Sequence, residues 1–328
     1  MSEHIVTGDD ADIRLDRWFK RHFPALTHAL LEKHLRKGEI RLDGKKAKSS
    51  DHVWAGQVID VRCQVADGRK KNPTPDPRPL SPDDARMMQN AVLYKDESII
   101  ILNKPYGLPV QGGSRIAKSV DDLLGGLSFG GDRPKLTHRL DRDTTGCLVL
   151  ARNAKTANFL MKLFSSRRIE KTYIALVAGC PLHMQGVVDR PLLKKQNPRA
   201  SGQPGGPEGR DYEIMQVDEK GQKSVTEYRV MDACARRFAL MELKPLTGRM
   251  HQLRVHMQSI GCPITGDYKY GGANTDAESL GVENKLHLHA RRIVIPASAG
   301  GRPIDVKAPL PPHMVKSLKA LGIDIPKK

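Results

Sequence analysis

The stretch LTHRLDRDTTGCLVLAR, residues 136–152, holds the residues best suited to chemistry. Two carboxylates, Asp141 and Asp143, lie in a polar segment that leads through Gly146 into an apolar, strand-like run. A carboxylate on a tight loop at the end of a strand can reach a substrate, and the neighbouring arginines would keep it ionised. An ionised carboxylate is a usable covalent nucleophile. The alternative is turn chemistry, because Asp and Thr before Gly often only bond backbone amides.

Strand-like segments surround this stretch and would have to position it. Runs rich in Ile, Val, Leu and Tyr predict strands at SIIILNK, GCLVLAR, KTYIALVAG, SVTEYRVMD, RFALMELKP and RRIVIP. In the same part of the chain, helical spacing occurs only in KTANFLMKLFSSRR and RMHQLRVHMQSIG. Because few strand pairs are separated by a crossover helix, we predict an α+β fold with a mixed, mainly antiparallel sheet.

Composition divides the chain into three parts. Residues 11–66 contain two helical runs, with Gly38 in a helix-ending position, and two short strand-like runs, which predict a small α/β domain. Residues 67–87 are dense in proline and charge and predict an extended linker. Residues 88–328 would form the larger domain, in which the polar, Gly- and Pro-rich segment 194–211 predicts a mobile surface insertion.

The net charge indicates a polyanionic partner. The 328 residues include 54 Lys and Arg against 37 Asp and Glu, a formal charge of +17, and neutralising phosphates releases condensed counterions. Basic residues gather where the second helical run of the small domain meets the following turn, at Arg36, Lys37, Arg41, Lys45 and Lys46. This placement favours docking on an RNA backbone, and a solvated charged helix face is the alternative.

The composition also excludes several protein classes. Five scattered cysteines without a C-x-x-C pair argue against a disulfide framework or a zinc ribbon and favour a reducing compartment. No apolar run approaches the roughly 20 residues of a membrane span, and the acidic N-terminus lacks a secretory pattern. We therefore expect a cytoplasmic protein that has no membrane partner.

Two patterns imitate ligand sites and are rejected. GGSRIAKS, residues 112–119, is similar to a phosphate-binding loop but lacks its second glycine, so we expect no nucleotide cofactor. The pairs His251 with His256 and His287 with His289 lack the cysteines or the spaced carboxylate that metal sites add, so no metal is expected. These histidines are expected to satisfy buried hydrogen bonds or to contact phosphate.

Five ordered motifs resemble those of the RluA-type pseudouridine synthases, which convert uridine to pseudouridine in RNA. They are LNKPYGLPVQGGS, HRLDRDTTG, RRIEKTYIALVAG, LTGRMHQLRVHMQSIGCPITGDYKYG and LHLHARRIVIP. Together they span most of residues 90–310, with one departure, P-A-S where H-P usually follows the last strand. The segments RLDRWF, HLRKGEIRLDGKK and AGQVIDV of residues 11–66 are similar to the alpha-L type RNA-binding domain, which is common in this family.

The resemblance implies which residues carry out the reaction. Asp141 would be the catalytic aspartate and would attack either the anomeric carbon of the ribose or the uracil ring. Arg254 would pair with Asp141 and hold it ionised, and Arg249 of the same motif is the weaker candidate. The glycosidic bond would break, the base would turn, and its carbon 5 would be joined to the ribose.

The resemblance also implies which residues hold the substrate. Tyr173 would lie against the flipped uracil and assist removal of the carbon 5 proton. Arg139 would fill the space that the uridine leaves. Leu288 would form the floor of the pocket, with Leu286 as the alternative. Because an isomerisation involves no net redox change or hydrolysis, no cofactor is expected.

The substrate implied is large-subunit ribosomal RNA. The motifs favour the RluC-like branch of the family, followed by the RluD-like branch or transfer-RNA specificity, and we expect a monomer. A rival from another class is an RNA-binding ribosome-assembly factor in which catalysis is secondary or lost. The intact set of Asp141, Tyr173 and Arg254 disfavours that rival.

Overall fold

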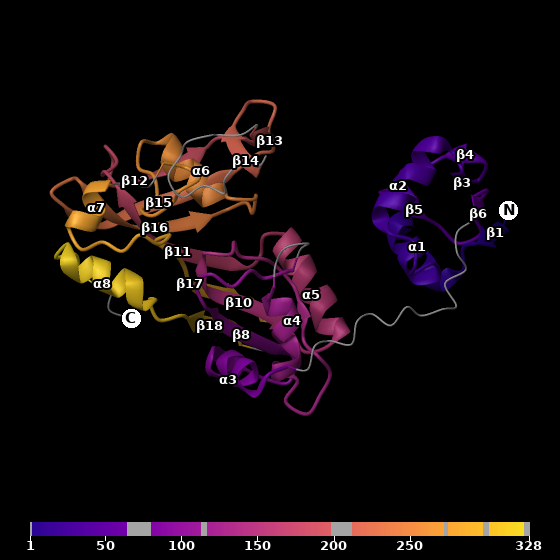
Figure 1. The fold of residues 1–328 in the computed structure, drawn as a ribbon, viewed down its shortest axis with the longest axis horizontal. Helices are drawn as coiled ribbons and strands as arrows, with labels where there is room; N and C mark the ends of the chain where they lie inside the picture. The colour runs from indigo at the N-terminus through magenta and orange to yellow at the C-terminus, as the bar shows by residue number, and fades with distance from the viewer. Residues whose placement is uncertain are drawn as a thin grey trace. The chain divides into compact units, whose positions relative to one another are not determined.

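The computed structural model describes residues 2–63, 80–112, 117–197, 212–271, 275–297 and 302–324. The chain divides into two compact units, Met1–Pro79 and Leu80–Lys328 (Figure 1). Within the described ranges, no helix is both long enough and apolar enough to cross a membrane.

The first unit is a small α/β unit in which two helices pack against short strands. Its elements are β1 (Ser2–Ile5), η1 (Gly8–Asp10), β2 (Ile13–Arg14), α1 (Leu15–His22), α2 (His28–Lys37), β3 (Ile40–Leu42), β4 (Lys45–Lys46), β5 (His52–Val53) and β6 (Val58–Val61). One sheet has the order β1–β6–β3–β4, and β2 pairs with β5. Apolar side chains of α1 and α2, such as Trp18 and Leu35, form the core together with strand residues.

Helix α2 ends where the sequence predicts. Gly38 follows it with φ 71°, in the left-handed region that favours glycine, and this confirms the predicted helix end. At the other end, the Thr27 hydroxyl accepts a hydrogen bond from the Leu30 amide at 3.4 Å. The turn after Gly38 leads directly into β3 and β4, which bring further basic residues beside the last turn of the helix.

The second unit is built on one large sheet. Its elements are α3 (Pro82–Asn90), β7 (Val92–Lys95), β8 (Ile99–Lys104), α4 (Val120–Leu123), η2 (Leu124–Leu127), β9 (Lys135–Leu136), β10 (Thr145–Ala151), α5 (Ala154–Ser165), β11 (Glu170–Ala178), β12 (Gln185–Asp189), β13 (Leu192–Asn197), β14 (Tyr212–Val217), β15 (Val225–Cys234), β16 (Phe238–Pro245), α6 (Gln252–Ser259), α7 (Thr275–Ser279), β17 (Leu288–Ile295), β18 (Ile304–Lys307) and α8 (Pro312–Ala320). The six predicted strands correspond to β8, β10, β11, β15, β16 and β17, and the two predicted helices to α5 and α6.

The order of the strands confirms the predicted fold class. The ten-stranded sheet runs β12–β15–β16–β11–β17–β10–β8–β7, with β18 paired to β17 and β9 to β10. Only β10 and β17 are parallel, and every other neighbouring pair of this sheet is antiparallel. The fold is therefore a mixed α+β fold with a mainly antiparallel sheet.

Helices cover both faces of this sheet, because alternate strand residues are apolar on both sides. On β10, Leu148 and Leu150 pack with residues of α3 and α4, whereas Cys147 and Val149 pack with α5. On β11, odd-numbered residues such as Ala175 pack with α6, and even-numbered ones pack with α8. The cross-strand register places α3, α4 and α6 on one face and α5 and α8 on the other (Figure 1).

A close approach between β10 and β17 holds the centre of the sheet together. Gly146 has φ 103°, and a Cβ atom there would lie 2.3 Å from the Ala290 carbonyl oxygen. Glycine is therefore required where the loop that carries Asp141 enters β10. The contact sets that loop beside Leu288 at the start of β17.

The predicted boundary between the linker and the larger domain is wrong. Residues 82–87 of the predicted linker form most of the first two turns of α3, while residues 67–79 lie outside the described part. The physical reason is a helix start, since the Ser81 side chain accepts from the Asp84 amide and Pro82 occupies the first turn. Helix α8 was likewise not predicted; it also begins with a proline.

The predicted mobile insertion at 194–211 is wrong at its start. Residues 194–197 belong to β13, which pairs antiparallel with β14, and residues 198–211 lie outside the described part. The hairpin has its own reason to form, because Leu192 and Met215 are buried in a small apolar cluster with Val255 of α6. The hairpin therefore braces the helix that carries Arg254.

Candidate active site

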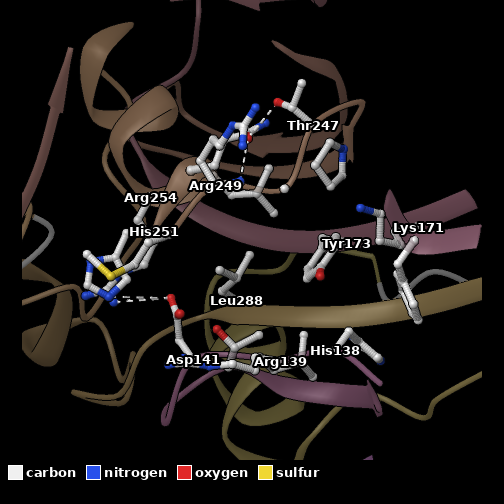
Figure 2. Close-up of a pocket in the computed structure, with 18 of the residues that line it drawn as sticks. His138, Arg139, Asp141, Lys171, Tyr173, Thr247, Arg249, His251, Arg254 and Leu288 are labelled. Atoms are coloured by element: carbon white, nitrogen blue, oxygen red, sulfur yellow. Dashed lines mark hydrogen bonds and ion pairs between the residues drawn. The ribbon is translucent and has the colours of Figure 1, made fainter. Parts of the chain in front are cut away.

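A cavity of about 720 Å³ lies on the sheet face that α6 covers. It is formed by the loop before β10, the start of β11, the segment between β16 and α6, and the first residue of β17. All five residues predicted for the site line this cavity: Arg139, Asp141, Tyr173, Arg254 and Leu288 (Figure 2). Residues as far apart in the sequence as Arg139 and Leu288 are thus gathered around one space, which is large enough for a nucleoside.

The Asp141 carboxylate faces a buried arginine. Asp141 Oδ2 lies 3.5 Å from Arg254 Nη1, and Figure 2 shows the carboxylate pointing towards this guanidinium. The other nitrogens of Arg254 are fixed, because Nε and Nη2 donate to the two oxygens of fully buried Asp267 at 2.6 and 2.7 Å. Burial alone would lower the pKa of Arg254, but the hydrogen bonds and charge of Asp267 together with the charge of Asp141 outweigh it and raise that pKa. Arg254 therefore stays cationic and presents one free edge to Asp141.

A buried lysine ties down the loop that carries Asp141. The Lys104 ammonium donates to three backbone carbonyls at 2.7–2.9 Å, those of Pro105, Leu108 and Arg142. Burial lowers the pKa of Lys104 to about 7. Because Arg142 follows Asp141 directly, the end of β8 fixes the peptide next to the carboxylate.

Tyr173 and Leu288 form apolar walls of the cavity. Tyr173 follows a register shift in β11 and packs against both apolar clusters that flank the cavity. Burial, with a smaller contribution from the Asp141 charge, raises the pKa of Tyr173, so its phenol stays protonated. Leu288 is 3% exposed and lines the cavity, whereas Leu286 is absent from its lining. The geometry thus favours Leu288 over Leu286 as the floor.

The two other arginines of the motifs lie at the cavity without contacting Asp141. Arg139 is exposed and lines the cavity. Arg249 also lines it, but its Nε donates to the Lys223 carbonyl at 3.4 Å. Among the described residues, Arg254 is the arginine that pairs with Asp141.

His251 belongs to the site, and the sequence reasoning missed it as such. Its Nε2 lies 3.9 Å from Asp141 Oδ2, and its Nδ1 lies 2.7 Å from the Tyr270 hydroxyl. That hydroxyl oxygen already accepts from the Met215 amide, so its proton is best placed on the bond to Nδ1. The ring then carries its own proton on Nε2, facing Asp141. Burial lowers the pKa of His251 to about 4, which keeps the ring neutral.

The other three histidines of the rejected pairs satisfy buried hydrogen bonds, as predicted. His256 bonds Thr226 and the Arg190 carbonyl, and His287 bonds Ser317 and the Lys285 carbonyl. His289 bonds the Thr145 hydroxyl and the Ala308 carbonyl. In the described residues, the one group with metal-type donors within 4.8 Å is His34, Glu39 and Cys63 in the first unit, where His34 and Glu39 already pair at 2.6 Å.

The five basic residues predicted to contact RNA lie together in the first unit. Arg36 and Lys37 occupy the last turn of α2, Arg41 lies in β3, and Lys45 and Lys46 form β4. Lys45 and Lys46 are exposed. This arrangement presents a cationic edge to solvent, and its contact with RNA stays a prediction.

Comparisons with known proteins agree with this site. Residues 98–259 match the family model described as RNA pseudouridylate synthase. The chain is 34% identical over 316 residues to ribosomal large subunit pseudouridine synthase C of Rickettsia bellii, covering 94% of this chain and 98% of the relative, and 31% identical over 315 residues to the Vibrio cholerae protein of that name, covering 95% and 94%. The solved structure of human RNA pseudouridylate synthase domain containing 4 matches with a TM-score of 0.61 at 32% identity, covering 74% of this chain and 97% of that one. The chain therefore belongs to the RluA family of RNA pseudouridine synthases.

Proposed function

We propose that this enzyme converts specific uridines of large-subunit ribosomal RNA into pseudouridine, with Asp141 as the nucleophile. The observation that carries the proposal is the Asp141–Arg254 pair at 3.5 Å inside a cavity walled by Tyr173 and Leu288. A carboxylate beside a fixed guanidinium can attack, while the aromatic and aliphatic walls can hold a flat base. The names of the relatives from Rickettsia bellii and Vibrio cholerae support the ribosomal substrate.

The target base has to leave its stack before the reaction. Extrusion costs a few kcal/mol, and an exposed guanidinium such as that of Arg139 can occupy the space left behind. Asp141 then attacks either the anomeric carbon or the uracil ring. The bond between N1 and the ribose breaks, the base turns, a bond between carbon 5 and the ribose forms, and the bond to Asp141 is broken again, which restores the carboxylate. The reaction needs neither a redox cofactor nor ATP, because carbon 5 loses the proton that N1 gains.

Arg254 and His251 face the carboxylate of the nucleophile before it attacks. Arg254 remains cationic because Asp267 fixes it, and the Nε2 proton of neutral His251 faces the same carboxylate oxygen. Tyr173 contributes mainly a ring that packs against uracil. Since its phenol is protonated in the resting site, it assists removal of the carbon 5 proton only after passing its own proton on.

Chemical mapping of pseudouridine tests the proposal. Ribosomal and transfer RNA would be mapped from cells that lack the chain and from cells supplied with the wild type or with Asp141→Asn. We expect one or more large-subunit sites that depend on the wild type and are absent with Asp141→Asn. Sites confined to transfer RNA would overturn the ribosomal assignment. Modification that persists with Asp141→Asn would overturn the role of Asp141.

An RNA-binding assembly factor is the alternative from another class, and the same cells distinguish it. If ribosome assembly depends on the chain but not on its chemistry, Asp141→Asn will restore normal subunit profiles in a sucrose gradient without restoring modification. We expect a growth or assembly phenotype, where one exists, to follow the modification.

A further inference from the structure

A second cavity, of about 740 Å³, opens on the other face of the sheet. It lies over the start of β11 and the adjoining parts of β15, β16, β17 and β18, and side chains such as Thr172 and Ile174 form its floor. Its lining contains seven Lys and Arg side chains against three Glu side chains. The excess of cations indicates that an occupant of this cavity would be anionic.

The second cavity begins where the active-site cavity ends. Arg167, Lys171 and Pro245 line both spaces, so the two are joined around the start of β11. Figure 2 shows Lys171 across the active-site cavity from Asp141, next to Tyr173. A chain that enters the active site can therefore pass these two cations and continue onto the other face.

The cations at this junction lack compensating carboxylates. Within the described part of the chain, no ion pair involves Arg167 or Lys171, whereas Arg229 and Lys244 share Glu242 at 3.3 and 3.9 Å. Burial and the neighbouring Arg167 lower the pKa of Lys171. A partly buried ammonium in this state is stabilised by a nearby anion.

The far side of the second cavity is also lined by cations. Arg291 of β17 and Lys307 of β18 line the cavity there, and burial lowers the pKa of the Arg291 guanidinium. Lys307 is the register partner of Arg292, whose guanidinium pairs with Asp305. Positive charge thus extends from the junction across several strands and is not confined to one point, as a site for a single small anion would be.

We propose that Arg167 and Lys171 bind an RNA phosphate next to the target uridine and that the second cavity holds the strand leaving the active site. The inference rests on the proposed function, because the strand is identified by its continuity with the active-site cavity. Phosphate contacts of this kind give affinity and register without reading sequence.

Binding of a probe that needs no target sequence tests the proposal. A fluorescent 12-nucleotide oligouridylate would be titrated at several salt concentrations against the wild type, Lys171→Gln and Lys307→Gln. We expect each substitution to weaken binding several-fold and to reduce the slope of log K against log salt by about 0.7, the value for one phosphate contact on a single strand. Lys319→Gln is the matched control, because Lys319 is exposed on α8 and lines neither cavity.

Shortening the probe locates the contact along the strand. Shortening from one end to four nucleotides should abolish the effect of Lys307→Gln and preserve that of Lys171→Gln. Equal effects of Lys171→Gln and Lys319→Gln, or an effect of Lys307→Gln that is independent of length, would overturn the proposal. So would uridine monophosphate binding as tightly as the 12-mer, since that indicates a small-anion site.

The binding assay separates this inference from the proposed function. If the wild type forms no pseudouridine but Lys171→Gln still weakens oligouridylate binding, the reaction assignment fails and the phosphate site stands. If modification is confirmed and the salt slopes are unchanged, the phosphate site fails alone. On a mapped substrate, Lys307→Gln should raise KM and leave kcat at saturating RNA unchanged, which a loss of folding would not do.

Discussion

Arg254 performs its role through three nitrogens at once. Nε and Nη2 hold Asp267, and Nη1 is left facing Asp141. The bidentate contact fixes the plane of the guanidinium, so the distance to Asp141 is set before substrate binds. A lysine ammonium in the same position is a point charge and could not hold both oxygens of Asp267 while also facing Asp141.

Arg254→Lys should therefore lose most activity although it keeps the charge. We expect single-turnover modification to fall by about a hundredfold, the size typical of losing one preorganised donor. Because Asp267 would stay buried with an incomplete partner, we expect the unfolding free energy of the variant to fall by about 3 kcal/mol. Arg86→Lys, in an exposed pair with Asp83, is the control and should change neither value. If Arg254→Lys kept wild-type turnover, the contact of Arg254 with Asp267 would not matter for the reaction.

At this scale the sequence predicted the residues better than their partners. The resemblance pointed to Asp141, Arg254, Tyr173, Arg139 and Leu288, and all of them line one cavity. It could not point to Asp267, since a buried carboxylate in a Gly-Asp-Tyr turn has the same local pattern as an exposed one. His251 was rejected as a metal ligand and was expected to satisfy a buried hydrogen bond or to contact phosphate. Its proximity to Asp141 depends on a left-handed backbone, φ 52°, that no spacing rule reveals.

At the scale of elements, the junction of β10 with β17 sets the geometry of the site. Gly146 is the second residue of β10, and Ala290 of β17 lies where its side chain would be. Lys104 at the end of β8 fixes the same loop from the other side. The position of Asp141 thus depends on three neighbouring strands and not on its own loop alone.

Gly146→Ala should consequently destabilise the fold and displace the site. The new Cβ would overlap the Ala290 carbonyl, and the φ of 103° is strained for alanine, so we expect a loss of at least about 2 kcal/mol in urea unfolding. Gly125→Ala is the matched control, because nothing lies within 4 Å of a Cβ there, and it should be nearly neutral. Equal midpoints for the two variants would contradict the proposed tight junction.

The apolar pattern was sufficient for the strands and insufficient for several other elements. Strands β8, β10, β11, β15, β16 and β17 are runs rich in Ile, Val, Leu and Tyr, which the sequence shows directly. Helix α3 was hidden by the proline-rich stretch before it, although Ser81 and Pro82 form an ordinary helix start. The β13–β14 hairpin is polar along much of its length, and its burial against α6 is a tertiary effect that local composition does not carry.

On the scale of the whole molecule, buried neutral histidines make stability depend on pH. Burial lowers the pKa of His138 to about 3, and of His251, His287 and His289 to about 4. Their unfolded value is near 6.5, so the unfolded chain takes up these protons first as pH falls. Their contribution to stability is complete above pH 6.5 and is lost as the pH falls towards 4.

The unfolding free energy should thus decrease by roughly 1 kcal/mol per histidine when the pH falls from 6 to 5. Urea titrations of the full chain at several pH values would measure this slope. His289→Gln should reduce the slope by about one histidine's share, whatever it does to the absolute stability, whereas His28→Gln, at an exposed site, should leave it unchanged. A flat profile between pH 7 and pH 5 would contradict the neutral state of these side chains.

The role of Asp141 as the nucleophile is best tested by single-turnover modification of a mapped RNA with a pair of aspartate variants. Asp141 and Asp143 share one loop. Asp141 lies 3.5 Å from the buried Arg254, whereas Asp143 pairs at 4.0 Å with the exposed Arg142. We expect Asp141→Asn to bind the RNA with wild-type affinity and to form no pseudouridine, while Asp143→Asn retains turnover. Pseudouridine formed by Asp141→Asn, or lost only with Asp143→Asn, would contradict this role.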